Sequence, residues 1–238
     1  MKILSLETSA KSVSAAVVED GAPLAYAYQC TGLTHSRTLM PMISDMLQNA
    51  DLSLDDMDAV AVAAGPGSFT GLRIGVSAAK GLGWAKDLPC FGVSTLEAMA
   101  ENLAHLDGLI VCAMDARRHQ IYNAVFEAKG GTLTRLCPDR AVALSEVCEE
   151  LRTDPRPKFV LGDGALLCYD ALREAGIACT LAPAALRYQN AVGVGLAAER
   201  AKPVSAQELR PAYLRISQAE RERAARLRNE KSDSKITG

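Results

Sequence analysis

Four short polar stretches follow apolar runs that have the length of buried strands. In an open α/β sheet, ligands bind at the carboxyl ends of the strands, where such stretches converge. Carboxylates there could position Mg²⁺ or a water, and glycine turns leave backbone amides free for a phosphate. Each stretch also has a simple structural explanation, because acids cap helices and glycines form turns. The stretches predict a candidate nucleotide cleft that contains Glu7, Ser9, Gly65, Gly67, Asp115, Gly162 and Asp163.

The usual signatures of catalysis are absent from the sequence. It contains no His-x-x-x-His, no His-Glu-x-x-His and no Gly-x-Ser-x-Gly. The three histidines are scattered: His35 and His105 lie near the ends of expected helices, and His119 lies in an expected turn. We therefore assign no catalytic residue and no metal ligand.

The most distinctive stretch spans residues 65–75 and reads GPGSFTGLRIG. An apolar run leads into it, and a helix that begins with Ser68 or Thr70 as its N-cap is expected to reach about Lys86. Within that helix, small residues recur every four positions and form one ridge almost without side chains. A glycine inside a helix costs roughly 1 kcal/mol relative to alanine, so another backbone should lie close. That backbone belongs either to the chain's own sheet or to a partner helix.

The helix expected over residues 35–50 has a single apolar face that is rich in methionine. This face is either part of the core or an adaptable contact surface. Together with the ridge it predicts a partner interface, with an arginine as its polar contact. The predicted interface comprises Leu39, Met42, Ile43, Met46, Gly71, Arg73, Gly75, Ala79 and Gly83.

Composition narrows the class of protein. A formal charge of -2 over 238 residues gives no global basic signature for nucleic acid. The 7 cysteines show no C-x-x-C spacing and suggest free thiols in a reducing cytoplasm. The N-terminus reaches Glu7 too soon for a signal peptide, and no apolar run has the length of a membrane span. We expect a cytoplasmic protein that does not enter the membrane.

The order of the expected elements predicts an α/β fold with two lobes, each a mixed sheet flanked by helices. Hairpin-connected strands come first in each half, and helix and strand then alternate. We expect a first lobe over residues 1–105 and a second over 106–215, whose final helix packs back on the first. The charged tail, 216–238, is expected to be a partly helical, solvated segment or a weak basic patch.

The motifs together resemble those of the TsaB (YeaZ) family. They are ILSLETS at residues 3–9, the stretch 65–75, DARRHQIY at residues 115–122 and LRPAYLR at residues 209–215. The resemblance runs from the first strand to about Arg215, and residues 65–75 are its most specific part.

The resemblance implies an actin-like, ribonuclease-H-related ATPase fold with two lobes. It implies a role in forming N6-threonylcarbamoyladenosine at position 37 of tRNA. Proteins of this family are non-catalytic paralogues of the transferase subunit TsaD and bind it through helices of the first lobe. A TsaE-type ATPase joins the complex, tRNA is contacted indirectly, and without its partner the protein self-associates as a homodimer through similar surfaces. No cofactor is required, although ATP or ADP could lie in the cleft or at the partner interface.

One motif of the transferase paralogue is missing. Where the paralogue has a His-x-x-x-His metal motif, this sequence has Thr95 and Met99, which cannot replace two imidazoles. Glu97, between them, is expected to form a capping box with Ser94. The resemblance thus predicts a scaffold subunit that is not itself an enzyme.

Two alternatives remain open from the sequence. A stand-alone ATP-dependent phosphotransferase or ATPase would use the cleft, with Glu7 or Asp115 positioning Mg²⁺ or a water. A metalloprotease follows only from an older label given to relatives of the paralogue, and no ligand motif supports it. The sequence leaves open whether the cleft binds a nucleotide and whether the tail contacts tRNA.

Overall fold

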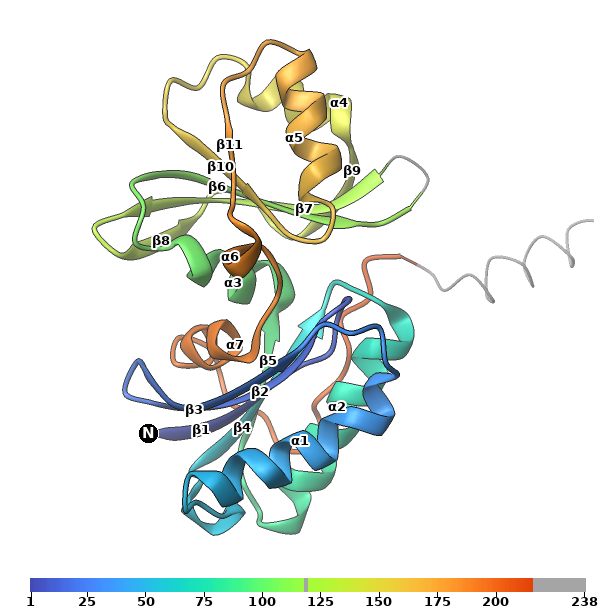
Figure 1. Ribbon diagram of the computed structural model, residues 1–238, viewed down its shortest axis with the longest axis vertical. Coiled ribbons are helices and arrows are strands. Elements are labelled where there is room, and N and C mark those ends of the chain that lie inside the picture. Colours follow the sequence, from blue (N-terminus) through green and yellow to red (C-terminus); the bar gives the residue numbers. More distant parts are fainter. Residues whose placement is uncertain (118–119, 216–238) are drawn as a thin grey trace, which may run out of the picture.

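Two β-sheets organise the chain in the computed structural model, which describes residues 1–117 and 120–215 (Figure 1). The first sheet has the strand order β3-β2-β1-β4-β5, and the second has the order β11-β10-β6-β7-β8. In each, the first two strands along the chain pair antiparallel, and the fourth and fifth of the order 3-2-1-4-5 join them in parallel. The second sheet therefore repeats the topology of the first.

The first lobe begins with three antiparallel strands and continues as alternating strands and helices. Its elements are β1 (Lys2–Glu7), β2 (Val13–Glu19), β3 (Ala22–Gln29), α1 (His35–Asn49), η1 (Leu54–Asp56), β4 (Ala59–Gly65), α2 (Phe69–Ala85), β5 (Cys90–Ser94), α3 (Thr95–Ala100) and η2 (Glu101–Leu103). Every residue of β4 is buried, as expected of a central strand that has helices on both faces.

The second lobe follows the same plan with shorter helices. Its elements are β6 (Gly108–Asp115), β7 (Gln120–Lys129), β8 (Thr132–Arg135), β9 (Arg140–Ala143), α4 (Leu144–Leu151), β10 (Lys158–Leu161), α5 (Ala165–Glu174) and β11 (Thr180–Leu181). β9 pairs with β7 beside the main order. After α6 (Ala184–Arg187), the chain returns to the first lobe as α7 (Ala191–Ala198).

The helices form separate layers on the two sheets (Figure 1). α1 and α2 cover one face of the first sheet, and α7 covers the other face, where it contacts β1, β2 and β4. α4 and α5 cover the outer face of the second sheet, and α3 lies between the sheets. α7 is apolar on all sides because it is enclosed between α3 and the first sheet.

The predicted fold class, an α/β protein with mixed sheets flanked by helices, is confirmed. The strands expected from the sequence are present, with ends that shift by a few residues. The sequence did not predict α6 or the two 3₁₀ turns, which are too short to have a periodicity of their own. His119 and the tail from residue 216 lie outside the described residues.

The C-terminal segment ties the lobes together. Val204 exchanges two backbone hydrogen bonds with Cys90, and the Ala212 N–H donates to the Ala64 carbonyl at 2.7 Å. Arg215 then reaches the second lobe, where its guanidinium donates to the Ala116 carbonyl at 2.6 Å. Residues 204–215 therefore run along the first lobe and end on the second.

Ion pairs at α3 also join the lobes and correct the role predicted for Glu97. The Ser94 hydroxyl accepts a hydrogen bond from the Glu97 N–H at 3.1 Å, so Ser94 does cap the helix. The Glu97 carboxylate, however, pairs with Arg135 of the second lobe at 2.9 Å and with Arg200 at 3.5 Å. Two guanidinium groups attract a carboxylate more strongly than a neutral backbone N–H does, so the reciprocal half of the capping box does not form.

Candidate functional site

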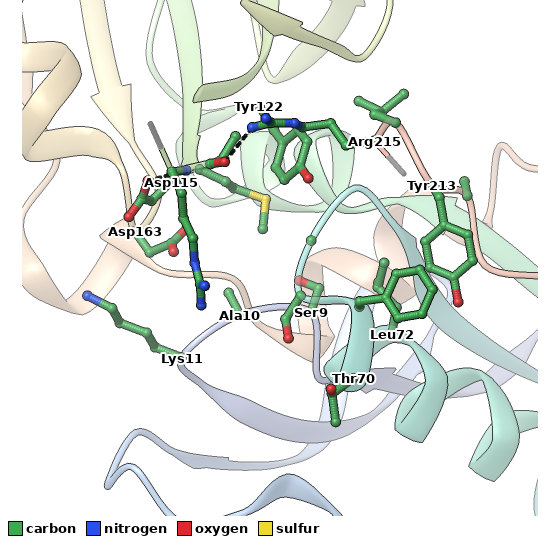
Figure 2. Close-up of a pocket in the computed structure, with 18 residues that line it drawn as sticks. Ser9, Ala10, Lys11, Thr70, Leu72, Asp115, Tyr122, Asp163, Tyr213 and Arg215 are labelled. Carbon is green, nitrogen blue, oxygen red and sulfur yellow. Dashed lines mark hydrogen bonds between the residues drawn. The ribbon is translucent and has the colours of Figure 1, made fainter. Parts of the chain in front are cut away.

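A cavity of about 510 Å³ lies where the two lobes meet. Its walls come from the ends of β1, β6 and β10, from the turn between β4 and α2, and from the C-terminal segment (Figure 2). Its lining residues are Ser9, Ala10, Lys11, Gly67, Ser68, Phe69, Thr70, Leu72, Met114, Asp115, Ala116, Arg117, Tyr122, Asp163, Ala212, Tyr213, Leu214 and Arg215. The volume lies within the range of small-molecule sites.

Four of the seven predicted cleft residues line this cavity: Ser9, Gly67, Asp115 and Asp163. The other three, Glu7, Gly65 and Gly162, are buried and are not part of the lining. The sequence stage missed Lys11, Thr70, Tyr122, Tyr213 and Arg215. Lys11 could have been found, since it follows Ser9 in the same turn, but the C-terminal pair reaches the cavity only through the path of residues 204–215.

The turn between β4 and α2 is held against the end of β1. The Ser68 side chain accepts a hydrogen bond from the Gly71 N–H at 3.3 Å, which confirms Ser68 as the N-cap. The Ser68 N–H donates to the Ser9 carbonyl at 2.7 Å. Gly65 has a φ of +144°, and a Cβ there would lie 2.1 Å from the Ala212 carbonyl oxygen, so only glycine fits.

The small-residue ridge of α2 packs on the chain's own sheet. A Cβ at Gly71 would lie 2.1 Å from the Thr8 carbonyl oxygen, and one at Gly75 would lie 2.4 Å from Thr8 Oγ1. Ala79 is fully buried, and a Cβ at Gly83 would lie 2.5 Å from the sulfur of Cys90. The interpretation of this ridge as a partner surface is corrected, because the sheet already occupies the space that a partner helix would need.

The methionine-rich face of α1 is corrected in the same way. Leu39, Ile43 and Met46 are buried in the core beneath the first sheet, and Met42 is partly buried against the same core. Of the predicted interface, only Arg73 is exposed. Its guanidinium carbon lies 4.0 Å from the centre of the Phe69 ring, and its Nε donates to the Tyr213 hydroxyl at 3.1 Å. The predicted interface is thus mainly the inner face of the α1–α2 layer.

Behind the cavity, Glu7 is a fully buried acid. Its Oε1 accepts a hydrogen bond from the Ser9 N–H, and its Oε2 has no partner among the described residues. Burial raises the pKa of Glu7 to about 7, against the lowering effect of the Ser9 hydrogen bonds and with a further rise from Asp163. Glu7 is therefore protonated in a large fraction of molecules at neutral pH.

On the other side of the cavity, Asp163 and Asp115 come from the second lobe (Figure 2). Burial raises the pKa of Asp163, although Gln189 Nε2 donates a hydrogen bond to its carboxylate at 3.1 Å. Asp115 is exposed, and its carboxylate accepts a hydrogen bond from the Arg117 N–H at 2.7 Å. The cavity thus holds carboxylates of different ionisation beside the ammonium of Lys11.

Comparison with known proteins decides the family. The family model for TsaD, the tRNA N6-adenosine threonylcarbamoyltransferase, matches residues 30–221. The tRNA threonylcarbamoyladenosine biosynthesis protein TsaB of Bacillus subtilis strain 168 is 35% identical over 224 residues, which cover 92% of this chain and 96% of the relative. The chain belongs to the TsaB family.

Other TsaB-family proteins agree with this assignment. TsaB of Escherichia coli K12 is 32% identical over 222 residues, which cover 90% of this chain and 95% of that protein. The crystal structure of a Pseudomonas aeruginosa protein with similarity to peptidase YeaZ superposes with a TM-score of 0.77 at 26% identity, covering 90% of this chain and 99% of that one. The duplicated 3-2-1-4-5 order is that of the actin-like, ribonuclease-H-related fold implied by the resemblance to TsaB.

In this TsaB-family chain, the two positions that match the paralogue's metal motif are enclosed. Thr95 and Met99 are both fully buried, and Met99 belongs to an apolar cluster with Met114 and Phe126 of the second lobe. Across residues 1–117 and 120–215, no group of three or more His, Cys, Asp and Glu side chains is arranged to hold a metal ion. Met99 thus serves packing between the lobes.

The outer surface of the α1–α2 layer carries a groove of about 480 Å³. It is lined by Ser36, Leu39, Met40, Phe69, Thr70, Arg73, Ile74, Ser77 and Ala78. Met40 is 46% exposed, and Trp84, near the end of α2, is 78% exposed. No helix in the described part of the chain is long and apolar enough to cross a membrane, so this apolar surface does not belong to a spanning segment.

Proposed function

We propose that this chain is a non-catalytic subunit of the complex that makes N6-threonylcarbamoyladenosine at position 37 of tRNA, and that it docks a TsaD-type catalytic subunit. Membership of the TsaB family supports the link to tRNA threonylcarbamoyladenosine biosynthesis, which is what its relatives are named for. A TsaE-type ATPase joins the same complex in this proposal, and tRNA is contacted through the complex.

The observation that carries the docking role is the groove on the outer surface of α1 and α2. It combines apolar side chains, Met40 and Ile74, with a polar rim at Arg73 and Ser77. Exposed tryptophan and arginine side chains are typical of the residues that dominate protein interfaces. This outer groove replaces the inner ridge as the proposed partner surface.

The correction changes which mutation tests docking. Gly75→Leu would strike Thr8 and Val62 inside the protein, so it would test folding. Ser77 is exposed and lines the groove, so Ser77→Trp fills the groove without disturbing the core. We expect Ser77→Trp to reduce co-purification with the TsaD-type subunit, and tRNA modification by the mixture, at least about tenfold, a loss of about 1.4 kcal/mol of binding free energy.

Glu174→Trp is the matched control, because Glu174 is an exposed residue near the end of α5 on the second lobe. It should leave both readouts unchanged. Docking through the groove is wrong if Ser77→Trp binds like the wild type while circular dichroism and thermal unfolding show an intact fold.

Nucleotide binding in the cavity is a second candidate function, favoured by the juxtaposition of Ser9, Lys11, Asp115 and Asp163 around one space. In this alternative the chain itself would be an ATPase or phosphotransferase. Titration of the isolated chain with ATP and Mg²⁺ by calorimetry tests it. Binding that is weakened in Asp115→Asn, together with measurable turnover, would favour the alternative, and the absence of heat at millimolar ATP would exclude it.

A further inference from the structure

The free edge of the first sheet is an unprotected strand. β3 is eight residues long and reads APLAYAYQ, and within the described part of the chain it pairs only with β2. Its side chains Leu24, Tyr26 and Tyr28 are 49%, 46% and 42% exposed. Proteins usually protect such an edge with charges, bulges, prolines or a short strand. Here Pro23 and a bulge between Val17 and Val18 affect only the start, so the rest of the edge can accept another strand.

A groove of about 810 Å³ runs beside this edge, between β3 and α1. The α1 side of the groove includes Arg37, Pro41 and Asp45, which recur every four residues and so lie on one helix face. Arg37 and Asp45 are exposed and form no ion pair in the described part of the chain. They are opposite charges placed at equal distances on either side of Pro41.

We propose that a second copy of this chain occupies the edge and the groove, with the two β3 strands antiparallel about a two-fold axis perpendicular to the sheets. The two five-stranded sheets then join into one. An antiparallel pair keeps equivalent side chains on the same face, so Tyr26 and Tyr28 of both copies form one aromatic surface. An isologous interface of this kind is the usual basis of a homodimer.

The charges of the groove are the reason for choosing a second copy over another protein. The same two-fold axis runs the α1 helices antiparallel, and it brings Arg37 of one copy opposite Asp45 of the partner subunit. The reverse pair forms at the other end of the helices. β3 itself carries no charge, so two copies meet without like-charge repulsion. The surface is self-complementary in charge, in backbone hydrogen bonding and in side chains.

This interface is distinct from the groove between α1 and α2. The proposed docking groove is lined by Met40, Arg73 and Ser77, none of which lines the groove beside β3. The homodimer implied by the resemblance would use surfaces similar to those that bind the partner, whereas the β3 interface leaves the docking groove free. The two ideas therefore make different predictions and can fail separately.

Charge reversal tests the interface by sedimentation equilibrium of the full chain. The wild type should approach twice 25.3 kDa with rising concentration. Arg37→Asp places two acids opposite each other at both ends, and Asp45→Arg places two arginines there. We expect each variant to raise the dimer dissociation constant at least about tenfold. Mixing the two variants should restore the dimer, because every pair is then of opposite charge.

Two further variants keep the test decisive. Tyr26→Lys, at a half-exposed position, should weaken the dimer by placing lysines on both edges, while Ser77→Trp should leave it intact. The proposal is overturned if the wild type is monomeric at all concentrations, or if the single charge reversals dimerise like the wild type. It is equally overturned if the mixture stays monomeric, or if Ser77→Trp rather than Tyr26→Lys abolishes the dimer.

Discussion

The two lobes share one topology, yet they treat the acid at the end of their first strand in opposite ways. Glu7 ends β1 and is fully buried, and Asp115 ends β6 and is exposed. In the first lobe, α2 presses its glycines against Thr8, and the Ser68 N–H donates to the Ser9 carbonyl, which closes the end of β1. The same position in one fold therefore carries an acid with a pKa of about 7 in one lobe and a solvated acid in the other.

The second lobe is also tightly packed, but its close contacts lie at a different depth. The Gly164 N–H donates to the Ala113 carbonyl at 3.0 Å, and a Cβ at Gly162 would lie 2.0 Å from that carbonyl oxygen. These contacts fall two residues before Asp115, which leaves its side chain at the surface of the cavity. The comparison teaches that topology places an acid at a strand end, whereas the distance between backbones decides whether that acid meets water.

The largest expected effect comes from opening the tight end of the first lobe with Gly71→Leu. The new side chain cannot avoid the Thr8 carbonyl oxygen, which is backbone and cannot swing away. We expect a loss of about 4 kcal/mol or more in the free energy of unfolding, measured by urea denaturation.

Gly81→Ala is the matched control on the same helix, because a Cβ at Gly81 meets nothing within 4 Å. It should stabilise the protein by about 0.5–1 kcal/mol through helix propensity. A Gly71→Leu protein as stable as the wild type would show that the end of β1 is not held by close contact with α2.

Glu7→Gln sharpens the contrast between the two acids. Because the pKa of Glu7 is about 7 in the folded protein against an ordinary value of 4.5, the folded state holds a proton that the unfolded state releases. The free energy of unfolding should therefore fall by about 3 kcal/mol as the pH rises from about 4.5 to above 7. Glu7→Gln should remove most of this fall, and the remainder should come from Asp163, whose raised pKa acts in the same direction.

Asp115→Asn is the counterpart in the second lobe, at the exposed strand end. Urea denaturation at pH 5, 6, 7 and 8 should give it the profile of the wild type. An unchanged profile in Glu7→Gln, or a flattened one in Asp115→Asn, would contradict the assignment of the buried acid.

The smallest effect concerns the link between the lobes. Arg135→Ala removes the ion pair with Glu97, and we expect a loss of about 1 kcal/mol that shrinks at high salt. Arg152→Ala removes an exposed pair with Glu149 within the second lobe and should cost less. Urea denaturation at low and high ionic strength separates the two, and equal losses in both variants would argue against a special role for the inter-lobe pair.

Much of the fold could be predicted from local patterns. Apolar runs marked the strands, the Ser68 and Ser94 caps marked helix starts, and strand-end acids marked the cavity, because these signals depend on neighbours in the chain. The partner surface was less predictable. Regular spacing gave a ridge on α2 and an apolar face on α1, but periodicity does not tell whether a face meets the chain's own core or another protein.

The sequence by itself determined the order of elements, the duplicated α/β plan and the strand ends at which Ser9, Asp115 and Asp163 converge. Only the tertiary structure decided that Glu7 is sealed from water, that the ridge of α2 is filled by Thr8, and that residues 204–215 reach the cavity. Burial and close approach depend on residues far apart in the chain, and local patterns carry no information about those distances.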